Sequence, residues 1–205
     1  MKYDVATGLS ERLTYGSHNV YLNDISPDGK KLLCSTSKPD ITRCPFSLSS
    51  LFEIDLTTLQ ADTLVAWDAY LGSASYSPDG KQLLVTGSPS AFGGIGKNCG
   101  EHPIANDFDT QAFIMDLATK KVQAITRDFN PTVSPVQWNR VDGCIYFDTT
   151  DGDCRHIYRY VPKTGGFEML PLEEDVITSF TLADDNPVVA AYVGGGNTST
   201  GVAYT

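Results

Sequence analysis

Residues 88–108, SPSAFGGIGKNCGEHPIANDF, concentrate the side chains with the most obvious chemical potential in the chain. They combine several glycines with a lysine, a cysteine and a histidine. A phosphate-binding loop needs Gly-x4-Gly-Lys-Ser/Thr between a strand and a helix. Here Gly96-Lys97 is followed by Asn98, and Ala91 stands where the first glycine is required. Both flanking segments have strand patterns and we expect no helix, so we predict no phosphate binding of this kind.

A metal site in the same stretch would have to use Cys99 and His102, with Asp107 or Asp109. Cys99-x-x-His102 is half of a zinc pattern, but no second Cys/His pair lies nearby. Cys154-Arg155-His156 belongs to another strand segment. We therefore predict no metal and no cofactor, and we interpret His102 as a solvated or locally hydrogen-bonded side chain.

The elements around this stretch form an internal repeat. Residues 25–33, ISPDGKKLL, return as residues 76–84, YSPDGKQLL. A degenerate copy follows at 138–146 and a fainter one at 182–189. Each copy places turn residues between two short β-rich runs, which is the pattern of a hairpin.

A second repeated element lies between these hairpins. LFEIDLTT at 51–58 matches AFIMDLAT at 112–119, and IYRYVPKTG at 157–165 is a third version. Each alternates apolar and polar residues, reaches a turn and is followed by another short strand. Each unit therefore has four antiparallel strands, here called a to d. Such units at intervals of about 40 to 60 residues are typical of β-propeller blades, whereas hairpins of a sandwich rarely repeat so closely.

The fold class we predict is all-β, a partial β-propeller of about four blades. The chain would begin with strands c and d of one blade and finish with strands a to c of another. A closed four-bladed ring is possible, but we favour a piece of a larger propeller, whose open blade edges would let it self-associate. The expected units are 1–16 (strands c and d), 17–66, 67–127 with a long b–c insertion at 88–110, 128–170, and 171–205 (strands a to c).

Composition narrows the function classes. The chain has 205 residues and a formal charge of −10, which disfavours nucleic-acid binding because that requires clustered Lys and Arg. No window has the roughly 20 apolar residues of a membrane span, and no signal peptide is visible. The five cysteines are an odd number, and a Cys34–Cys44 disulfide stays possible.

With both repeat elements in view, the chain resembles the N-terminal β-propeller of the prolyl oligopeptidase and dipeptidyl peptidase family of serine peptidases. The Ser-Pro-Asp-Gly-Lys turns, LFEIDLTTL and FIMDLATKKV are shared with many TolB-like propellers and specify fold. The runs SPDGKQLLVTGSPSAFGGIG, DTQAFIMDLATKKVQAITRDFNP and GCIYFDTTDGDCRHIYRY look like the propeller of exported bacterial members.

The resemblance implies a partner and a compartment. In that family the propeller filters access to an α/β-hydrolase domain with a Ser-Asp-His triad and a Gly-x-Ser-x-Gly elbow. This chain has no such elbow, so we predict no catalytic residue and no peptide hydrolysis by the chain alone. A periplasmic or secreted location is implied. Glu173-Glu174 could suggest the glutamate pair that holds a peptide amino terminus in some members, but we interpret it as a solvated turn.

Propeller geometry sorts the connections onto two faces. The a–b and c–d turns share one face, and the b–c and d–a connections share the other. The long b–c connections, which we place at Thr36–Ser49 and Ser88–Thr110, would therefore meet substrate or partners. We expect Phe92 or Ile95 to anchor the second connection. The residues expected to face a substrate or partner are Phe92, Lys97, Glu101, His102 and Asp107.

The function we predict is the non-catalytic propeller portion of a prolyl-oligopeptidase-like serine peptidase, which gates and helps to select peptide substrates for a hydrolase domain absent from this chain. The alternative is a TolB-like propeller acting as a protein-interaction scaffold. A metal-dependent propeller lyase would need a cluster of His and acidic ligands that the sequence does not display.

Overall fold

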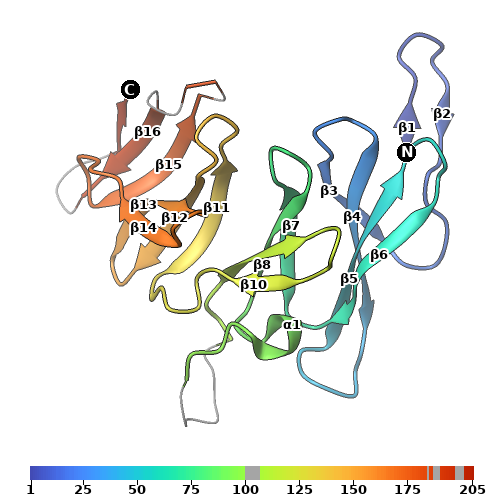
Figure 1. Ribbon diagram of the computed structural model, residues 1–205, viewed down its shortest axis with the longest axis horizontal. Coiled ribbons are helices and arrows are strands. Elements are labelled where there is room, and N and C mark those ends of the chain that lie inside the picture. Colours follow the sequence, from blue (N-terminus) through green and yellow to red (C-terminus); the bar gives the residue numbers. More distant parts are fainter. Residues whose placement is uncertain (100–106, 184, 187–189, 197–200) are drawn as a thin grey trace.

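The structure is a computed structural model that describes residues 1–99, 107–183, 185–186, 190–196 and 201–205. It is built almost entirely of antiparallel strands that form a series of sheets side by side (Figure 1). The first element is a hairpin of β1 (Lys2–Tyr3) and β2 (Ser10–Glu11). Both strands of this hairpin are short, because a hairpin with no third strand beside it is only marginally stable.

The first sheet contains β3 (Val20–Ile25), β4 (Lys31–Pro39), β5 (Ser47–Asp55) and β6 (Ala61–Asp68) in sequential order. The connection that we expected at Thr36–Ser49 is shorter than predicted. Thr36 pairs with Ser50 and Pro39 with Ser47, so the strands continue and only residues 40–46 remain as a loop. The ladder extends because each of these residues finds a partner on the opposite strand and because Leu48 is buried there.

The second sheet contains β7 (Leu71–Tyr76), β8 (Gln82–Gly87), β9 (Gln111–Asp116) and β10 (Val122–Ala124). β8 ends at Gly87 and β9 begins at Gln111, so residues 88–110 connect the two middle strands. This connection carries the short helix α1 (Ala91–Gly94).

The third sheet contains β11 (Thr132–Trp138), β12 (Ile145–Asp151), β13 (Cys154–Val161) and β14 (Gly166–Met169). β15 (Val176–Leu182), β16 (Ala190–Gly195) and β17 (Val202–Tyr204) follow as three antiparallel strands. One parallel pair, Arg155 with Val176, links β13 to β15.

The arrangement is a partial β-propeller, which confirms the predicted fold class. Figure 1 shows the sheets fanned from the N-terminal side to the C-terminal side, with the two ends of the chain on opposite sides of the molecule. Within the described residues, β1 and β2 pair only with each other, so the sheets do not close into a ring.

The repeated Ser-Pro-Asp-Gly turns are held by the same hydrogen bonds. The Ser26 hydroxyl donates to Asp28 at 2.7 Å, and the Ser77 hydroxyl donates to Asp79 at the same distance. Gly29 and Gly80 follow with φ near +70°, where glycine costs least. In the third copy Asn139 replaces the serine and accepts the backbone N–H of Val141.

The core lies between the sheets and explains the continuous apolar runs of the central strands. Leu83 and Val85 pack toward the first sheet, and Leu84 between them packs toward the third. Alternate residues of one strand point to opposite faces, so a blade with neighbours on both sides buries both sets. Phe113 and Phe147 are fully buried within these layers.

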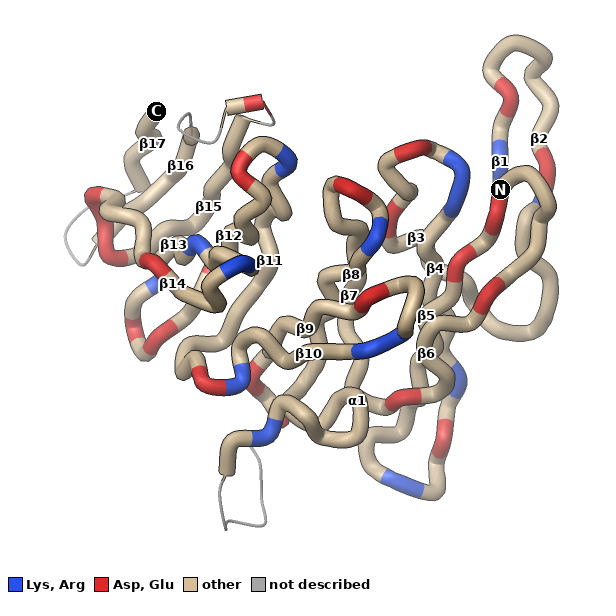
Figure 2. The backbone as a smooth tube through the Cα atoms, viewed as in Figure 1, with Lys and Arg blue, Asp and Glu red and all other residues tan. Residues whose placement is uncertain are grey.

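Acidic and basic residues are both scattered over the turns and loops, and Lys and Arg do not gather along one element of the described chain (Figure 2). Among the described residues, no helix is long and apolar enough to cross a membrane. All five cysteines lie in the described part, where each is a free thiol, including Cys34 and Cys44.

Candidate functional site

The connection between β8 and β9, called here the insertion (residues 88–110), is fixed to the body of the protein by its first residues. The backbone N–H of Ser88 donates to the Tyr70 carbonyl at 3.0 Å, and that of Phe92 donates to Asp68 Oδ2 at 2.8 Å. The Phe92 ring meets the Phe113 ring edge to face, with centroids 5.1 Å apart. Phe92 is thus an anchor of the insertion.

The turn that follows explains why glycines are concentrated here. Phe92, Gly93 and Gly94 all have positive φ, so α1 is a single irregular turn, although we had expected no helix. A Cβ at Gly96 would meet the side-chain oxygen of Gln111, the Phe113 ring and the backbone of Pro89, so glycine fits here without displacing these neighbours. These glycines therefore serve backbone geometry.

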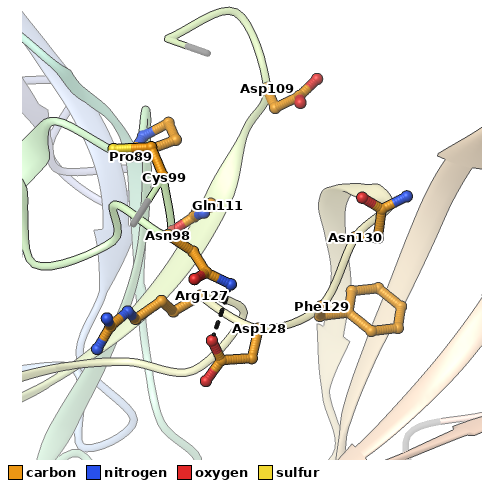
Figure 3. A pocket seen from close by; sticks show the side chains of 9 residues that line it. All are labelled: Pro89, Asn98, Cys99, Asp109, Gln111, Arg127, Asp128, Phe129 and Asn130. Atoms are coloured by element: carbon orange, nitrogen blue, oxygen red, sulfur yellow. Dashed lines mark hydrogen bonds between the residues drawn. The ribbon is translucent and has the colours of Figure 1, made fainter. Parts of the chain in front are cut away.

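A polar hollow of about 230 Å³ lies between the insertion and the connection from β10 to β11. Asn98 Nδ2 donates to Asp128 Oδ1 at 3.0 Å across it (Figure 3). Arg127 Nε donates to the Lys97 carbonyl at 3.1 Å. Gln111 Oε1 is buried in the wall without a hydrogen-bond partner among the described residues. The hollow is lined by Pro89, Asn98, Cys99, Asp109, Gln111, Arg127, Asp128, Phe129 and Asn130.

This polar hollow offers amide, carboxylate and guanidinium groups of both charge signs, which suits the recognition of a polar group. Within the described parts of the chain, no group of three or more His, Cys, Asp and Glu side chains is arranged to hold a metal ion. The groups that line the hollow are therefore hydrogen-bond donors and acceptors.

A second hollow, which we call the apolar hollow, lies on the other side of the insertion and has a volume of about 530 Å³. It extends from the β4–β5 connection to the start of β7 and the end of the insertion. Its walls are Cys44, Pro45, Ala69, Tyr70, Leu71, Ser88, Asp107 and Phe108.

The predicted site residues do not converge on one point. Phe92 points into the core, Lys97 is exposed and contributes its carbonyl next to the polar hollow, and Asp107 lies at the apolar hollow. Glu101 and His102 lie outside the described residues. The insertion separates the two hollows instead of gathering its polar side chains in one site.

Sequence reasoning missed the side chains that face the insertion from other connections. Arg127, Asp128 and Asn130 belong to a d–a connection, and Cys44 and Pro45 to the other b–c connection. The rule that b–c and d–a connections share one face was the available signal, because it places all these segments together.

The glutamate pair at 173–174 is only partly the solvated turn that we predicted. Glu173 is exposed, but Glu174 is half-buried and accepts a hydrogen bond from the Tyr204 hydroxyl at 2.6 Å. This hydrogen bond raises the pKa of Tyr204 to about 12. The two carboxylates therefore have different surroundings.

Solved structures share this fold, whereas no family model and no curated protein matches the chain. TolB from Acinetobacter baumannii superposes with a TM-score of 0.60 and 21% identity over 93% of the chain. Oligogalacturonate lyase in complex with manganese superposes with a TM-score of 0.69 and 14% identity over 94% of the chain. Acylaminoacyl peptidase in complex with Z-Gly-Gly-Phe-chloromethyl ketone superposes with a TM-score of 0.52 and 17% identity over 85% of the chain.

These similarities define the chain as a β-propeller of the kind found in TolB-like proteins and in enzymes. At identities of 14% to 21% they show the fold alone. The chain spans 41%, 52% and 28% of the lengths of these three proteins, respectively.

Proposed function

We propose that the chain is the non-catalytic propeller portion of a prolyl-oligopeptidase-like serine peptidase. It gates access and helps to select peptides for an α/β-hydrolase domain carried elsewhere in the parent protein. The observation that supports this role best is the pair of hollows beside the insertion, on the face where the long connections meet. The shared fold with acylaminoacyl peptidase is consistent with it.

The proposal includes the compartment and the substrate class. A periplasmic or secreted parent protein follows from the resemblance to exported peptidases, and the substrates are peptides. A dipeptidyl peptidase activity is a narrower form of the proposal. The Glu174 carboxylate, which is bonded to Tyr204, does not form a free pair with Glu173 for an amino terminus.

The experiment begins with the reading frame beyond Thr205 and continues with the parent protein. We expect a Gly-x-Ser-x-Gly elbow downstream. Deletion of residues 93–106 should change the ratio of kcat/KM for long and short peptides by at least about threefold. Lys163→Ala, at an exposed turn on the opposite face, is the control and should leave that ratio unchanged. An unchanged ratio in the deletion variant contradicts the proposal.

The second candidate is a TolB-like scaffold that binds other proteins. It is favoured by the similarity to TolB, which has the highest sequence identity of the three structures described above. A reading frame without a hydrolase domain would support this scaffold and refute the peptidase.

A further inference from the structure

The apolar hollow has a floor that is fixed by hydrogen bonds. The carboxylate of Asp68 accepts the backbone N–H of Tyr70 at 2.8 Å with one oxygen and that of Phe92 at 2.8 Å with the other. The Tyr70 carbonyl accepts the N–H of Ser88. One side chain therefore ties together the connection after β6 and the insertion, so the hollow is already formed between them.

Large apolar side chains are exposed on the two long connections that border this hollow. Phe108 is 99% exposed, Ile41 is 85% exposed and Phe46 is 65% exposed. The β4–β5 connection and the insertion both line the hollow, and they lie at the same end of the molecule (Figure 1). Exposed apolar groups gathered around a concave surface mark a binding site more often than a chance exposure does.

We propose that the apolar hollow binds one bulky apolar side chain of a peptide and prefers a basic residue next to it. The inference rests on the proposed function only for the choice of a peptide as ligand. It assigns to this chain a specificity determinant of its own, formed by Phe108, Ala69 and Leu71 with Asp107 at the edge.

The size of the hollow favours a side chain over a folded partner. Its volume of about 530 Å³ falls in the range of small-ligand pockets, which is roughly 300 to 1,000 Å³. A stable protein–protein interface takes about 20 to 30 residues from each partner, whereas eight residues line this hollow. A second copy of the chain would therefore bury too little surface here to form a stable dimer.

The charge at the edge gives the preference for a basic neighbour. Asp107 is exposed and, among the described residues, accepts one hydrogen bond, from the Ser88 hydroxyl at 3.2 Å. A carboxylate can accept about four, so this group retains the capacity to bind a peptide N–H or an ammonium group. The formal charge of −10 on the whole chain acts in the same direction.

The test is an NMR titration of the 205-residue chain with three capped tripeptides. The probes are Ac-Lys-Phe-Gly-NH2, Ac-Lys-Ala-Gly-NH2 and Ac-Glu-Phe-Gly-NH2. We expect the first probe to shift the backbone amides of Ala69, Tyr70 and Ser88 and to bind at least about fivefold more tightly than the alanine probe. The lysine probe should bind about twofold more tightly than the glutamate probe.

Three variants separate the contributions. Phe108→Ala should weaken binding of the phenylalanine probes, and Asp107→Asn should abolish the difference between the lysine and glutamate probes. Tyr15→Ala removes an exposed aromatic residue elsewhere and should bind like the unaltered chain. A dispersed amide spectrum for each variant confirms that it is folded, so a loss of binding is not a loss of fold.

The inference is overturned if the phenylalanine and alanine probes bind equally or not at all, or if Phe108→Ala has no effect. It is also overturned if sedimentation shows a dimer that Phe108→Ala dissociates, because a second copy then covers the hollow. Probe binding together with unchanged peptidase selectivity after deletion of residues 93–106 would contradict the proposed function and leave the binding site standing. Altered selectivity without probe binding would overturn the binding site and leave the proposed function standing.

Discussion

The Glu53 carboxylate joins the first two sheets through hydrogen bonds, and the loss of one of these bonds should lower the free energy of unfolding. Glu53 is only 5% exposed. It accepts the Tyr76 hydroxyl at 2.7 Å with one oxygen and the Lys31 ammonium at 2.9 Å with the other. The backbone N–H of Tyr76 donates to Asp24 in the neighbouring sheet at 2.8 Å. A buried charge of this kind is stable only while its hydrogen bonds are made.

Tyr76→Phe removes one of these donors and leaves the ring in place. A hydrogen bond to a charged group contributes about 1.5–3 kcal/mol, so we expect the free energy of unfolding to fall by about 2 kcal/mol. With an m-value of about 2–3 kcal/mol/M, the urea midpoint should fall by about 0.7–1 M. In a Glu53→Gln background the same substitution breaks only a neutral hydrogen bond and should cost about 1 kcal/mol.

Alkaline pH supplies an independent measurement of the same contact. Burial and the hydrogen bond to Glu53 raise the pKa of Tyr76 far above its usual value of about 10. The stability that this group contributes is therefore fully present below pH 10 and is lost as the pH rises through the folded-state pKa. The fall in the free energy of unfolding above pH 10 should be shallower in Tyr76→Phe than in the unaltered chain. A cost under about 0.5 kcal/mol that is equal in both backgrounds would refute the assigned role of the contact.

Two further predictions concern the turns. Hydrogen bonds from Ser77 and from the Lys81 backbone lower the pKa of Asp79, and Thr119 does the same for Asp116. The contribution of these two carboxylates to the free energy of unfolding is therefore present above about pH 4 and is lost as the pH falls through the lowered pKa values. Urea midpoints that stay level from pH 5 to pH 2.5 would contradict this. Leu59 has φ of 58°, a left-handed conformation that is costly for any residue with a Cβ. Leu59→Gly should therefore raise the free energy of unfolding by up to about 1 kcal/mol, whereas Leu59→Ala should not. Equal thermal midpoints for the two variants would count against strain at this position.

The turns were the part of the fold most open to prediction, because their chemistry is local. The same hydrogen bond closes the c–d turn in four copies: the N–H of Gly8, Leu59, Lys120 or Gly165 donates to the carbonyl four residues earlier. All four residues have positive φ. The sequence shows two of these positions as glycine, and the repeat identifies the other two despite their side chains.

Strand ends were harder to predict, since they depend on pairing across the sheet. Residues 36–39 contain no large apolar side chain, and Leu48 is the only one in residues 47–49, so these segments show too little alternation to predict strands. They continue β4 and β5 because each finds a partner opposite it. Pairing with a neighbouring strand depends on the tertiary structure, and this pairing overrides the local preference of a serine-rich segment for a loop.

The candidate site was predictable in position but not in shape. The length of the insertion and its place between strands b and c were readable from the repeat. The two hollows were not, because each combines the insertion with connections that lie far from it in the sequence. The positive φ of Phe92 also could not be anticipated, since a bulky residue rarely adopts it. The Phe92–Phe113 contact and the N–H bond to Asp68 hold it there.

The connections on the two faces of the propeller are built differently. On one face, the Pro-Asp-Gly turns are short, and a serine hydroxyl and an aspartate fix each of the first two copies. Changes there alter the hairpin itself. On the other face, the insertion begins and ends at strands that pair fully, as Gly87 with Gln111 shows. Residues beyond that pair can vary in length and type without disturbing the ladder. Binding specificity is therefore expected to change through the insertion and the β4–β5 connection, while the blades below them stay the same.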